Sequence, residues 1–225
     1  SIGKETFSHC SALTSIVWNA RKYKNFYSSY DNPFCNIRSQ ITSFAFGDSV
    51  EHIPAHLCNG MNNLTSVTIP ISVTSIADWA FQNCSALTSI TIPERVTSIG
   101  EYSFNGCTAL TSIIWNATDY STWDKTNHCP VSPFYEIRSQ ITSFIFGEKV
   151  EHIPAAICCG MKNLTSVTIP NGVTFIGNKA FSGCFSLTSV IWNAKEYTGY
   201  FQNYSDAPFY DARSNVTSFT FGDEV

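Results

Sequence analysis

The sequence is poor in charged residues and has no strongly basic segment. Charged residues make up 13% of the chain, about half the share found in an ordinary soluble domain, so Ser, Thr and Asn must supply most of the polar surface. With 13 Lys and Arg against 17 Asp and Glu, the net charge is −4, and the longest basic cluster is Arg21-Lys22-Tyr23-Lys24. This charge distribution argues against nucleic acid as a partner, because a surface that binds a polyanion needs clustered cations.

Membrane-spanning and secretion segments are also missing. The sequence contains no apolar run of about 18 residues, so no transmembrane helix is expected. It opens with neither a basic n-region nor an apolar h-region, and we expect any secretion signal to lie outside it. Hydrophobic residues nevertheless make up 44% of the chain, which indicates a folded core rather than intrinsic disorder.

The sequence is dominated by an internal repeat. The tripeptide Leu/Ile/Val-Thr-Ser opens the strand pattern of nine successive coils, at intervals of 28, 23, 23, 23, 31, 23, 23 and 29 residues. Each of the three long intervals contains a Trp-Asn-Ala sequence, so one type of coil carries an extra loop. The nine copies begin at Leu13, Ile41, Leu64, Leu87, Leu110, Ile141, Leu164, Leu187 and Val216.

Apolar residues within each unit follow the leucine-rich spacing LxxLxL. In the segment Leu64–Pro70, positions 1, 4 and 6 are apolar, which predicts a short parallel strand that faces a core between coils and ends at proline. The next apolar pair, Val73 and Ile76, predicts a second short extended segment. A coil of 23 residues cannot bury its own apolar stripe, so the coils must stack into a solenoid.

The unit continues with an Ala-Phe turn that ends in Cys, as in Ala80–Cys84, and we expect a one-turn helical or 3-10 corner there. Met61 and Met161 take the Cys position in two other coils. We therefore interpret the ladder cysteines as buried free thiols, with a Cys84–Cys107 bridge between successive coils as the alternative. The ladder cysteines are Cys10, Cys84, Cys107 and Cys184; Cys58 and Cys158 replace the corner Phe, and Cys35, Cys129 and Cys159 lie off the ladder.

Longer copies are superimposed on the coil period. Residues 37–44 and 137–144 are identical, which indicates tandem duplication. The sequence begins and ends inside a repeat and has no polar capping coil. We therefore expect residues 1–225 to form one domain of about nine coils, cut within a repeat at both ends and taken from a longer array.

The unit LTSVTIPxxVTSIGxxAFxxCxxLTS resembles the BspA-like, or Treponema pallidum-type, leucine-rich repeat over the whole of residues 1–225. The resemblance implies a leucine-rich-repeat solenoid, a right-handed β/α superhelix with a parallel concave sheet. Short extended and 3-10 or one-turn helical segments would lie on its convex side. Proteins of this family are secreted or surface-anchored products of host-associated bacteria and some protists, and several are implicated in adhesion to host matrix proteins or in co-aggregation. The resemblance thus implies binding at the cell surface or outside the cell, with no catalysis and no cofactor, and carries over no functional residues.

Candidate metal and catalytic groups are sparse. His52, His56 and Cys58 fall within seven residues, but Ala156 replaces His56 in the second copy, and zinc needs three or four convergent ligands. His128 and Cys129 form only an adjacent pair. The sequence has no GxSxG motif and no evident Asp/His/Ser set. We therefore expect neither a metal site nor an enzyme.

Two sets of residues are candidates for binding. Position 2 of every coil is Thr; stacked β-branched residues suit a strand ladder structurally, and the functional alternative is a regular hydroxyl face. Aromatic residues concentrate in the three long loops, where binding residues are favoured, although rings packed beneath their own loop are the alternative. The first set is Thr14, Thr42, Thr65, Thr88, Thr111, Thr142, Thr165, Thr188 and Thr217; the second is Tyr23, Phe26, Tyr27, Tyr30, Tyr120, Trp123, Tyr197, Tyr200, Phe201 and Tyr204.

These patterns predict a non-catalytic protein-interaction scaffold that resembles bacterial surface adhesins. Its expected partner is a host matrix or cell-surface protein. A carbohydrate-binding module, with affinity concentrated around Trp123 or the Tyr200–Phe201 pair, is one alternative. A structural stalk that displays other domains of a larger surface protein is the other.

Overall fold

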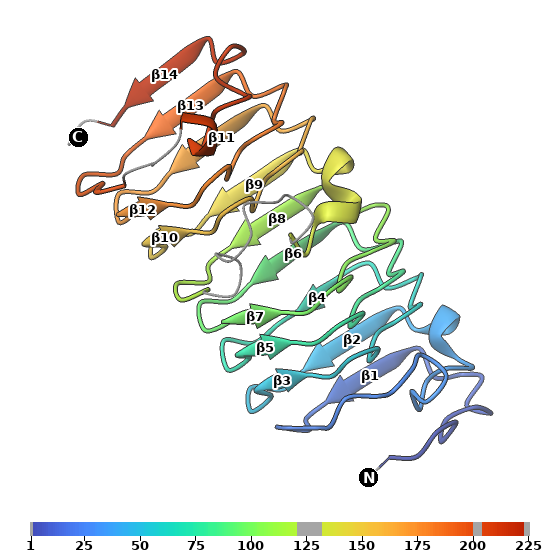
Figure 1. Cartoon of the computed structure of the whole chain (residues 1–225). Helices are drawn as coiled ribbons and strands as arrows, with labels where there is room; N and C mark the ends of the chain where they lie inside the picture. The colour runs from blue at the N-terminus through green and yellow to red at the C-terminus, as the bar shows by residue number, and fades with distance from the viewer. Residues whose placement is uncertain (1, 121–131, 200–203, 223–225) are drawn as a thin grey trace.

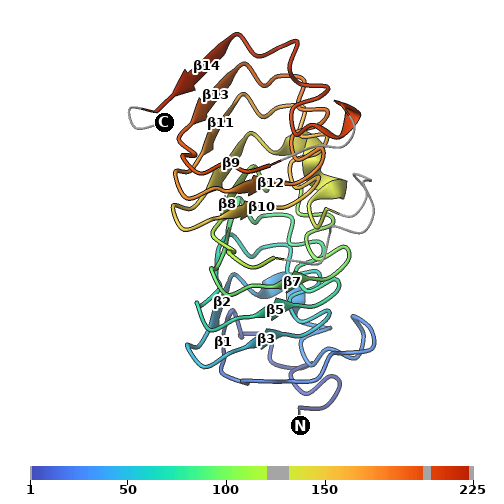
Figure 2. The ribbon, with the colours of Figure 1, turned by 60° about the vertical axis from the view of Figure 1, so that its left-hand side comes forward.

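In the computed structural model, the protein is a solenoid whose coils stack along one axis (Figure 1). The structure describes residues 2–120, 132–199 and 204–222. Strands lie side by side along one side of the stack, and two-residue strands line a second side (Figure 2). The long row consists of β1 (Ser15–Trp18), β2 (Ser43–Phe46), β4 (Val67–Thr68), β6 (Ser89–Ile92), β8 (Ser112–Trp115), β9 (Ser143–Phe146), β11 (Ser166–Ile169), β13 (Ser189–Trp192) and β14 (Ser218–Phe221). The second row consists of β3 (His52–Ile53), β5 (Ser75–Ile76), β7 (Ser98–Ile99), β10 (His152–Ile153) and β12 (Phe175–Ile176).

Neighbouring strands pair in parallel and in register, so equivalent residues of successive coils stack on one another. Ser15 of β1 pairs with Ser43 of β2, and Ile169 of β11 pairs with Trp192 of β13. The hydrogen-bonded groups in the long row are β1-β2-β4, β6-β8-β9 and β11-β13-β14. A full coil returns the chain to the sheet in the same direction, and parallel pairing follows. The predicted leucine-rich-repeat solenoid is confirmed.

Side chains alternate between the core and solvent along each long strand. In β6, Ile90 and Ile92 are 2% and 0% exposed, whereas Ser89 and Thr91, which alternate with them, face solvent. In β14, Phe219 and Phe221 occupy the same inward positions but are 47% and 63% exposed, because no described coil covers the far side of that strand. The prediction that positions 4 and 6 face the core therefore holds where a coil has neighbours on both sides.

Corner Phe residues stack into a ladder through the core. The ring centroids of Phe81 and Phe104, from successive coils, lie 5.5 Å apart with planes 6° apart. Phe104 stacks in turn on Phe134, at 5.3 Å, so the Pro-Phe pair that ends a long loop supplies the corner ring of its coil. The other stacked pairs of this ladder are Phe7 with Phe34 and Phe181 with Phe209.

Two nearly identical segments, the first copy (residues 37–63) and the second copy (residues 137–163), use Gln to bind the preceding coil. Gln40 Nε2 donates to the backbone carbonyls of Cys10 and Leu13, at 2.7 and 2.9 Å. The amide thus gives a donor to the Leu13 carbonyl and a second donor to the Cys10 carbonyl, which also accepts from Leu13 N. Gln140 donates in the same way to the carbonyls of Cys107 and Leu110.

Both copies replace the corner Phe by Cys and carry larger strand residues. In the first copy the corner is Cys58, and the strand rings of Phe44 and Phe46 lie 5.0 Å apart. Phe46 also lies edge-on to Phe81 of the next coil, at 6.3 Å. Exchange of bulk between strand and corner keeps the volume of a coil nearly constant, as close packing requires. The second copy repeats this arrangement with Cys158, Phe144, Phe146 and Phe181.

The Asn of each Trp-Asn-Ala sequence lies against a glycine of the next coil. A Cβ atom on Gly147 would lie 2.2 Å from Asn116 Oδ1, so a larger residue cannot fit without displacing the amide. This contact explains why each Trp-Asn-Ala coil is followed by a Phe-Gly coil. The equivalent pairs are Asn19 with Gly47 and Asn193 with Gly222.

The corner itself consists of turns closed by bonds from residue i to residue i−3, the spacing of a 3-10 helix, which agrees with the predicted one-turn or 3-10 corner, although the turns do not join into a continuous helix. Gln82 N donates to Trp79 O, but Phe81 N donates sideways to Ser103 O of the next coil, at 2.9 Å. These corner N–H groups are thus used between coils and do not close a helix. The described 3-10 helices follow long loops instead and are η1 (Arg38–Gln40), η3 (Tyr135–Gln140) and η4 (Tyr204–Asp206).

Cysteines of the ladder are buried free thiols, as predicted, except for exposed Cys10. Cys84 and Cys107 are both free, which excludes the alternative bridge between them. The thiol of Cys84 donates instead to the carbonyl of Cys58 in the preceding coil, at 3.2 Å. Burial raises the pKa of Cys184 to about 12. Off the ladder, Cys35 is buried and free, Cys159 is disulfide-bonded, and Cys129 lies outside the described residues.

Candidate functional site

The outward side chains of the long row form a continuous surface, which we call the strand face. It comprises positions 2, 3 and 5 of the nine coils, where position 2 is Thr, position 3 is Ser and position 5 varies. All nine Thr residues of position 2 are exposed, as listed in sequence order: Thr14, Thr42, Thr65, Thr88, Thr111, Thr142, Thr165, Thr188 and Thr217. Register stacking therefore brings the predicted Thr set together in one line.

Threonine hydroxyls of the strand face also support the ladder. Thr188 donates to the carbonyl of Thr165 through both its backbone N–H, at 2.9 Å, and its Oγ1, at 3.3 Å. Thr217 repeats this pair of bonds to Thr188, at 2.9 and 3.3 Å. Each hydroxyl keeps its acceptor lone pairs for a ligand. The structural and binding interpretations of the Thr set are thus compatible.

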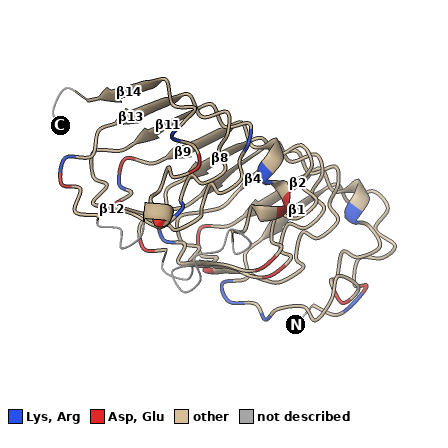
Figure 3. Cartoon of the chain, turned by 45° about the horizontal axis from the view of Figure 1, so that its top comes forward, with Lys and Arg blue, Asp and Glu red and all other residues tan. Residues whose placement is uncertain are grey.

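Position 5 gives the strand face its apolar content. Ile114 of β8 pairs in register with Ile145 of β9, and Ile145 is 51% exposed. Ile191 of β13 is 39% exposed, and Val17 of β1 is 68% exposed. Charged residues occupy none of positions 2, 3 and 5, and Figure 3 shows Lys, Arg, Asp and Glu on the turns and loops beside the strands.

Several loop aromatics predicted as binding residues pack against the core. Tyr23 lies edge-on to Trp18, at 5.3 Å, and its hydroxyl bonds the backbone of Ile2. Phe26 is 8% exposed, so the expectation that it is available at the surface is corrected. Tyr120 and Tyr197 are partly buried and lie edge-on to Trp115 and Trp192, at 4.9 and 5.1 Å. The alternative of rings packed beneath their loop applies to these four residues.

Three loop aromatics are exposed. Tyr27, Tyr30 and Tyr204 are 91%, 68% and 71% exposed. Arg213 lies over Tyr204 at 4.6 Å, and Arg38 lies over Tyr30 at 5.9 Å. In Figure 2, η4 and the loop after β1 lie on the side of the stack away from the long strands, so these tyrosines belong to a different surface from the strand face. Trp123, Tyr200 and Phe201 lie outside the described residues.

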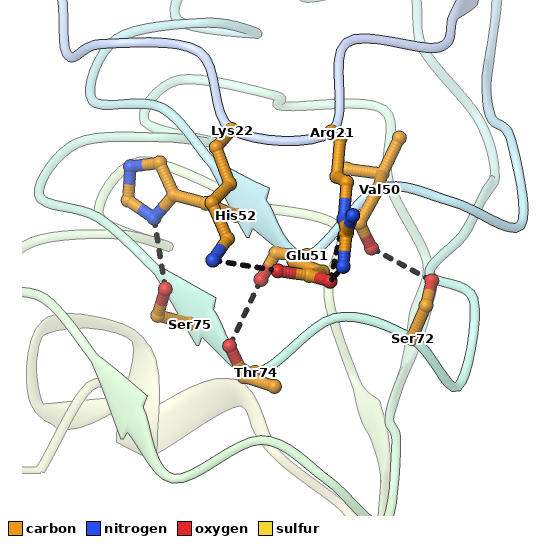
Figure 4. A network of polar contacts seen from close by, with 8 residues as sticks. All are labelled: Arg21, Lys22, Val50, Glu51, His52, Ser72, Thr74 and Ser75. Carbon is orange, nitrogen blue, oxygen red and sulfur yellow. Dashed lines mark hydrogen bonds and ion pairs between the residues drawn. The ribbon is translucent and has the colours of Figure 1, made fainter.

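A polar network surrounds Glu51 in the first copy (Figure 4). Arg21 Nε and Lys22 Nζ lie 2.7 and 3.1 Å from its carboxylate, and their hydrogen bonds lower the pKa of Glu51. His52 Nδ1 lies 2.8 Å from Ser75 Oγ, and its Nε2 lies 2.9 Å from Asn25 Oδ1. This network joins the loop after β1 to the short strands, so its role is to hold that loop.

The histidine and cysteine residues that are grouped in the sequence do not converge in the structure. His52 is held by Ser75 and Asn25, His56 stacks on Trp79, and Cys58 is fully buried. Within the described ranges, no group of three or more His, Cys, Asp or Glu residues could hold a metal ion. The second pair, His128 and Cys129, lies outside those ranges.

An aromatic stack that sequence reasoning missed lies on the corner that follows β3, β5 and β7. His56 stacks on Trp79 at 4.9 Å with planes 4° apart, and Trp79 stacks on Tyr102 at 6.3 Å with planes 7° apart. Each is the third residue after the Ile that ends a short strand, and each has a positive φ, of 62°, 55° and 55°. Alignment of this position across the coils gives Glu5, His56, Trp79, Tyr102, Ala156 and Lys179. The residue type thus varies from coil to coil, and the exposed fraction varies with it, from 45% for Tyr102 to 2% for Ala156.

The comparisons with known proteins concern the repeat itself. The profile of the "BspA type Leucine rich repeat region" matches residues 28–125 and 128–224, with six copies. No curated protein matches the chain. In the described part of the chain, no helix is both long enough and apolar enough to cross a membrane.

Similar solved structures are bacterial leucine-rich-repeat proteins. A leucine-rich-repeat protein of T. pallidum is 17% identical over 78% of this chain and 72% of its own, with a TM-score of 0.49. A leucine-rich cell surface protein of Faecalibacterium prausnitzii is 18% identical over 97% of this chain and 68% of its own, with a TM-score of 0.38. The family profile spans most of the chain and agrees with the stacked coils, and the chain therefore belongs to the BspA-type leucine-rich-repeat family.

Proposed function

We propose that this chain is a protein-interaction scaffold of a bacterial surface protein and that its strand face binds a host matrix or cell-surface protein. The observation that carries the proposal is the composition of the strand face, an uncharged row of Ser and Thr interrupted by the partly exposed Ile114 and the exposed Ile145 and Ile191. Outward Ile residues in register on neighbouring strands expose apolar area to solvent, and this exposure does not stabilise an isolated chain. Such patches mark interaction sites.

The geometry of the strand face favours a protein over a small ligand. Short side chains on in-register parallel strands leave a broad surface, which suits contact spread across several coils. Contact over several coils also predicts that single hydroxyl changes have small effects, while loss of the three Ile residues has a large one. An uncharged interface further predicts binding that depends weakly on salt.

Location at the cell surface is supported by the family, and an adhesive role follows from it. The leucine-rich neighbour from Faecalibacterium prausnitzii is a cell surface protein. Cys159 is disulfide-bonded, and disulfides persist in oxidising, extracellular environments. An exposed apolar strand face on such a protein would meet host and matrix proteins first.

The test is binding of the purified chain to immobilised fibronectin, laminin, collagen and fibrinogen, and to a glycan array, at two salt concentrations. We expect saturable binding to a matrix protein that changes little between the two salts. The variant I114T/I145T/I191T should weaken that binding by about tenfold or more, since each buried Ile contributes roughly 1.5–3 kcal/mol.

A matched control is I71T, because Ile71 is 61% exposed on a turn outside the strand face. This control should bind as the parent chain does. Equal binding by the triple variant and the parent would overturn the strand-face proposal. Saturable binding to the glycan array alone would replace the protein ligand by a carbohydrate.

A further inference from the structure

We infer that the aromatic stack of His56, Trp79 and Tyr102 is a second interaction surface, which binds an arginine-bearing segment of a protein partner. The inference does not rest on the strand face. The stack follows the short strands β3, β5 and β7 in the second row, whereas the strand face lies on the long row. Its parts are the three rings, the acidic groups beside them and the backbone that fixes them.

Backbone bonds between coils hold the three rings in place. His56 N donates to the carbonyl of Asp78, at 3.2 Å, and Trp79 N donates to the carbonyl of Glu101, at 3.0 Å. The rings therefore repeat with the spacing of the coils, and their planes stay within 4° and 7° of parallel. A pre-formed stack loses little entropy when a planar group adds to it or lies along its edge.

The left-handed backbone at this position does not require an aromatic residue. Ala156 and Lys179 occupy it in other coils, with φ of 54° and 57°. Bulky and β-branched side chains are the least favourable ones for a backbone with positive φ. Three successive aromatics at a position where alanine and lysine also fold are thus not explained by the needs of the coil.

Acidic side chains border the stack. The corner segments 54–62, 77–86 and 100–109 contain two charged residues, Asp78 and Glu101, and no Lys or Arg. The charge of Asp31 also reaches His56.

Arg38 belongs to the same coil as His56, and its side chain lies against Gly60. Its Nε donates to the Cys35 carbonyl, at 2.8 Å, so the group is already engaged.

Aromatic faces and carboxylates together select a planar cation. A guanidinium stacks on aromatic rings and donates to carboxylates in a fork, whereas an ammonium is a compact and strongly hydrated charge. Tyr102 is 45% exposed and His56 and Trp79 are partly exposed, so each ring of the stack reaches solvent. The complementary ligand is a segment of a protein partner that carries exposed arginine.

The test uses a nona-arginine peptide as the probe and isothermal titration calorimetry of the purified chain at low and moderate salt. We expect saturable binding that weakens as salt rises, with nona-lysine at least about threefold weaker. The W79A variant should bind about tenfold more weakly, and D78N/E101Q should lose most of the salt dependence. Circular dichroism and thermal unfolding confirm that each variant is folded, as Ala156 indicates for W79A.

Two controls separate this surface from the rest of the chain. K179A changes the equivalent position outside the stack and should bind the peptide as the parent does, and so should I114T/I145T/I191T of the strand face. A folded W79A with unchanged affinity, or equal affinity for the two peptides in both parent and W79A, would overturn the inference. If I114T/I145T/I191T loses binding to the matrix protein but keeps binding to the peptide, the two surfaces act independently, as the inference predicts.

Discussion

The first copy (residues 37–63) and the second copy (residues 137–163) show which parts of a coil are fixed by stacking and which are free. They differ at seven positions. Four of these, such as Ala45 against Ile145, are exposed in both copies, and a fifth exchanges buried Leu57 for Ile157. The remaining two exchange His56 for Ala156 and Asn59 for Cys159. Most core residues are thus shared and four exposed positions have diverged, but the contacts of His56 with Trp79 and of Asn59 with Gln82 in the next coil are lost with Ala156 and Cys159.

The largest effect should come from the shared strand rings, and it should be the same in both copies. Phe46 and Phe146 are 8% and 4% exposed and meet the corner ring of the next coil at 6.3 and 6.1 Å. Each Phe-to-Ala change should lower the free energy of unfolding by about 3–5 kcal/mol, because it leaves a cavity between two coils. Urea unfolding followed by circular dichroism measures this. A cost below about 1 kcal/mol in either copy would show that the ring does not bridge the coils.

A smaller loss is expected when the contact between the Trp-Asn-Ala and Phe-Gly coils is disturbed. In Gly147→Ala the new Cβ would lie 2.2 Å from Asn116 Oδ1, which should cost about 1–3 kcal/mol in unfolding free energy. Gly172→Ala is the matched control, because its nearest atom would be 3.5 Å away, and it should change stability by less than about 0.5 kcal/mol. Rescue of Gly147→Ala by Asn116→Ala would attribute the loss to this one contact, and failure of the rescue would contradict it.

Removal of Gln140 in the second copy should cost more stability than removal of Gln40 in the first copy. Gln140 binds partly buried carbonyls, whereas one of the two bonds of Gln40 is exposed. Gln140→Ala should therefore cost about 1–3 kcal/mol and Gln40→Ala about 0.5–1.5 kcal/mol, since both bonds of Gln140 are partly buried, although the Cys107 carbonyl keeps its bond from Leu110 N. Thermal unfolding of the two variants in one buffer compares them. The reverse order would mean that exposure of the acceptors does not control the cost.

The smallest expected effects on stability come from replacing His52 in the first copy and His152 in the second copy. His52 bonds Ser75 and Asn25, whereas His152 is exposed beside Phe175. His52→Ala should cost about 0.5–1.5 kcal/mol, and His152→Ala less than about 0.5 kcal/mol.

The His52 effect should also depend on pH. Burial lowers the pKa of His52 below its ordinary value of 6.5, so the fold favours the neutral ring. Its contribution is present above that pH and is lost as the pH falls. The gap between parent and His52→Ala should narrow from pH 7.5 to pH 5, and a gap that widens would contradict this assignment.

The sequence predicts the coils, the strands and the core well, because stacking imposes one residue type on each inward position. Leu87, Ile90 and Ile92 are each at most 2% exposed, and the free thiol of Cys107 follows from the same repeated position. The Thr found at position 2 of every coil likewise indicates an outward-facing position. Strict periodicity makes these features readable without a structure.

Features that depend on contacts between different coil types were not predicted. The corner turns resemble a helix in composition, yet Phe81 N donates to a carbonyl of the next coil. This bond cannot be predicted from the sequence of one repeat unit, because it joins two coils. Tyr23 has the sequence context of an exposed loop aromatic, but in the structure its ring packs edge-on against Trp18. The stack of Trp79 and Tyr102 lies at a position whose residue type varies from coil to coil, so a search for repeated residues passes over it.

The most direct test of the central claim, that outward residues of the strand face carry binding, exchanges position 5 between the copies. The claim predicts that I145A weakens binding to the matrix protein identified in the panel, while A45I leaves thermal stability unchanged and strengthens or preserves binding. Surface plasmon resonance on the parent, I145A, A45I and A45I/I145A measures this. Equal affinity for that matrix protein across all four proteins would contradict the claim.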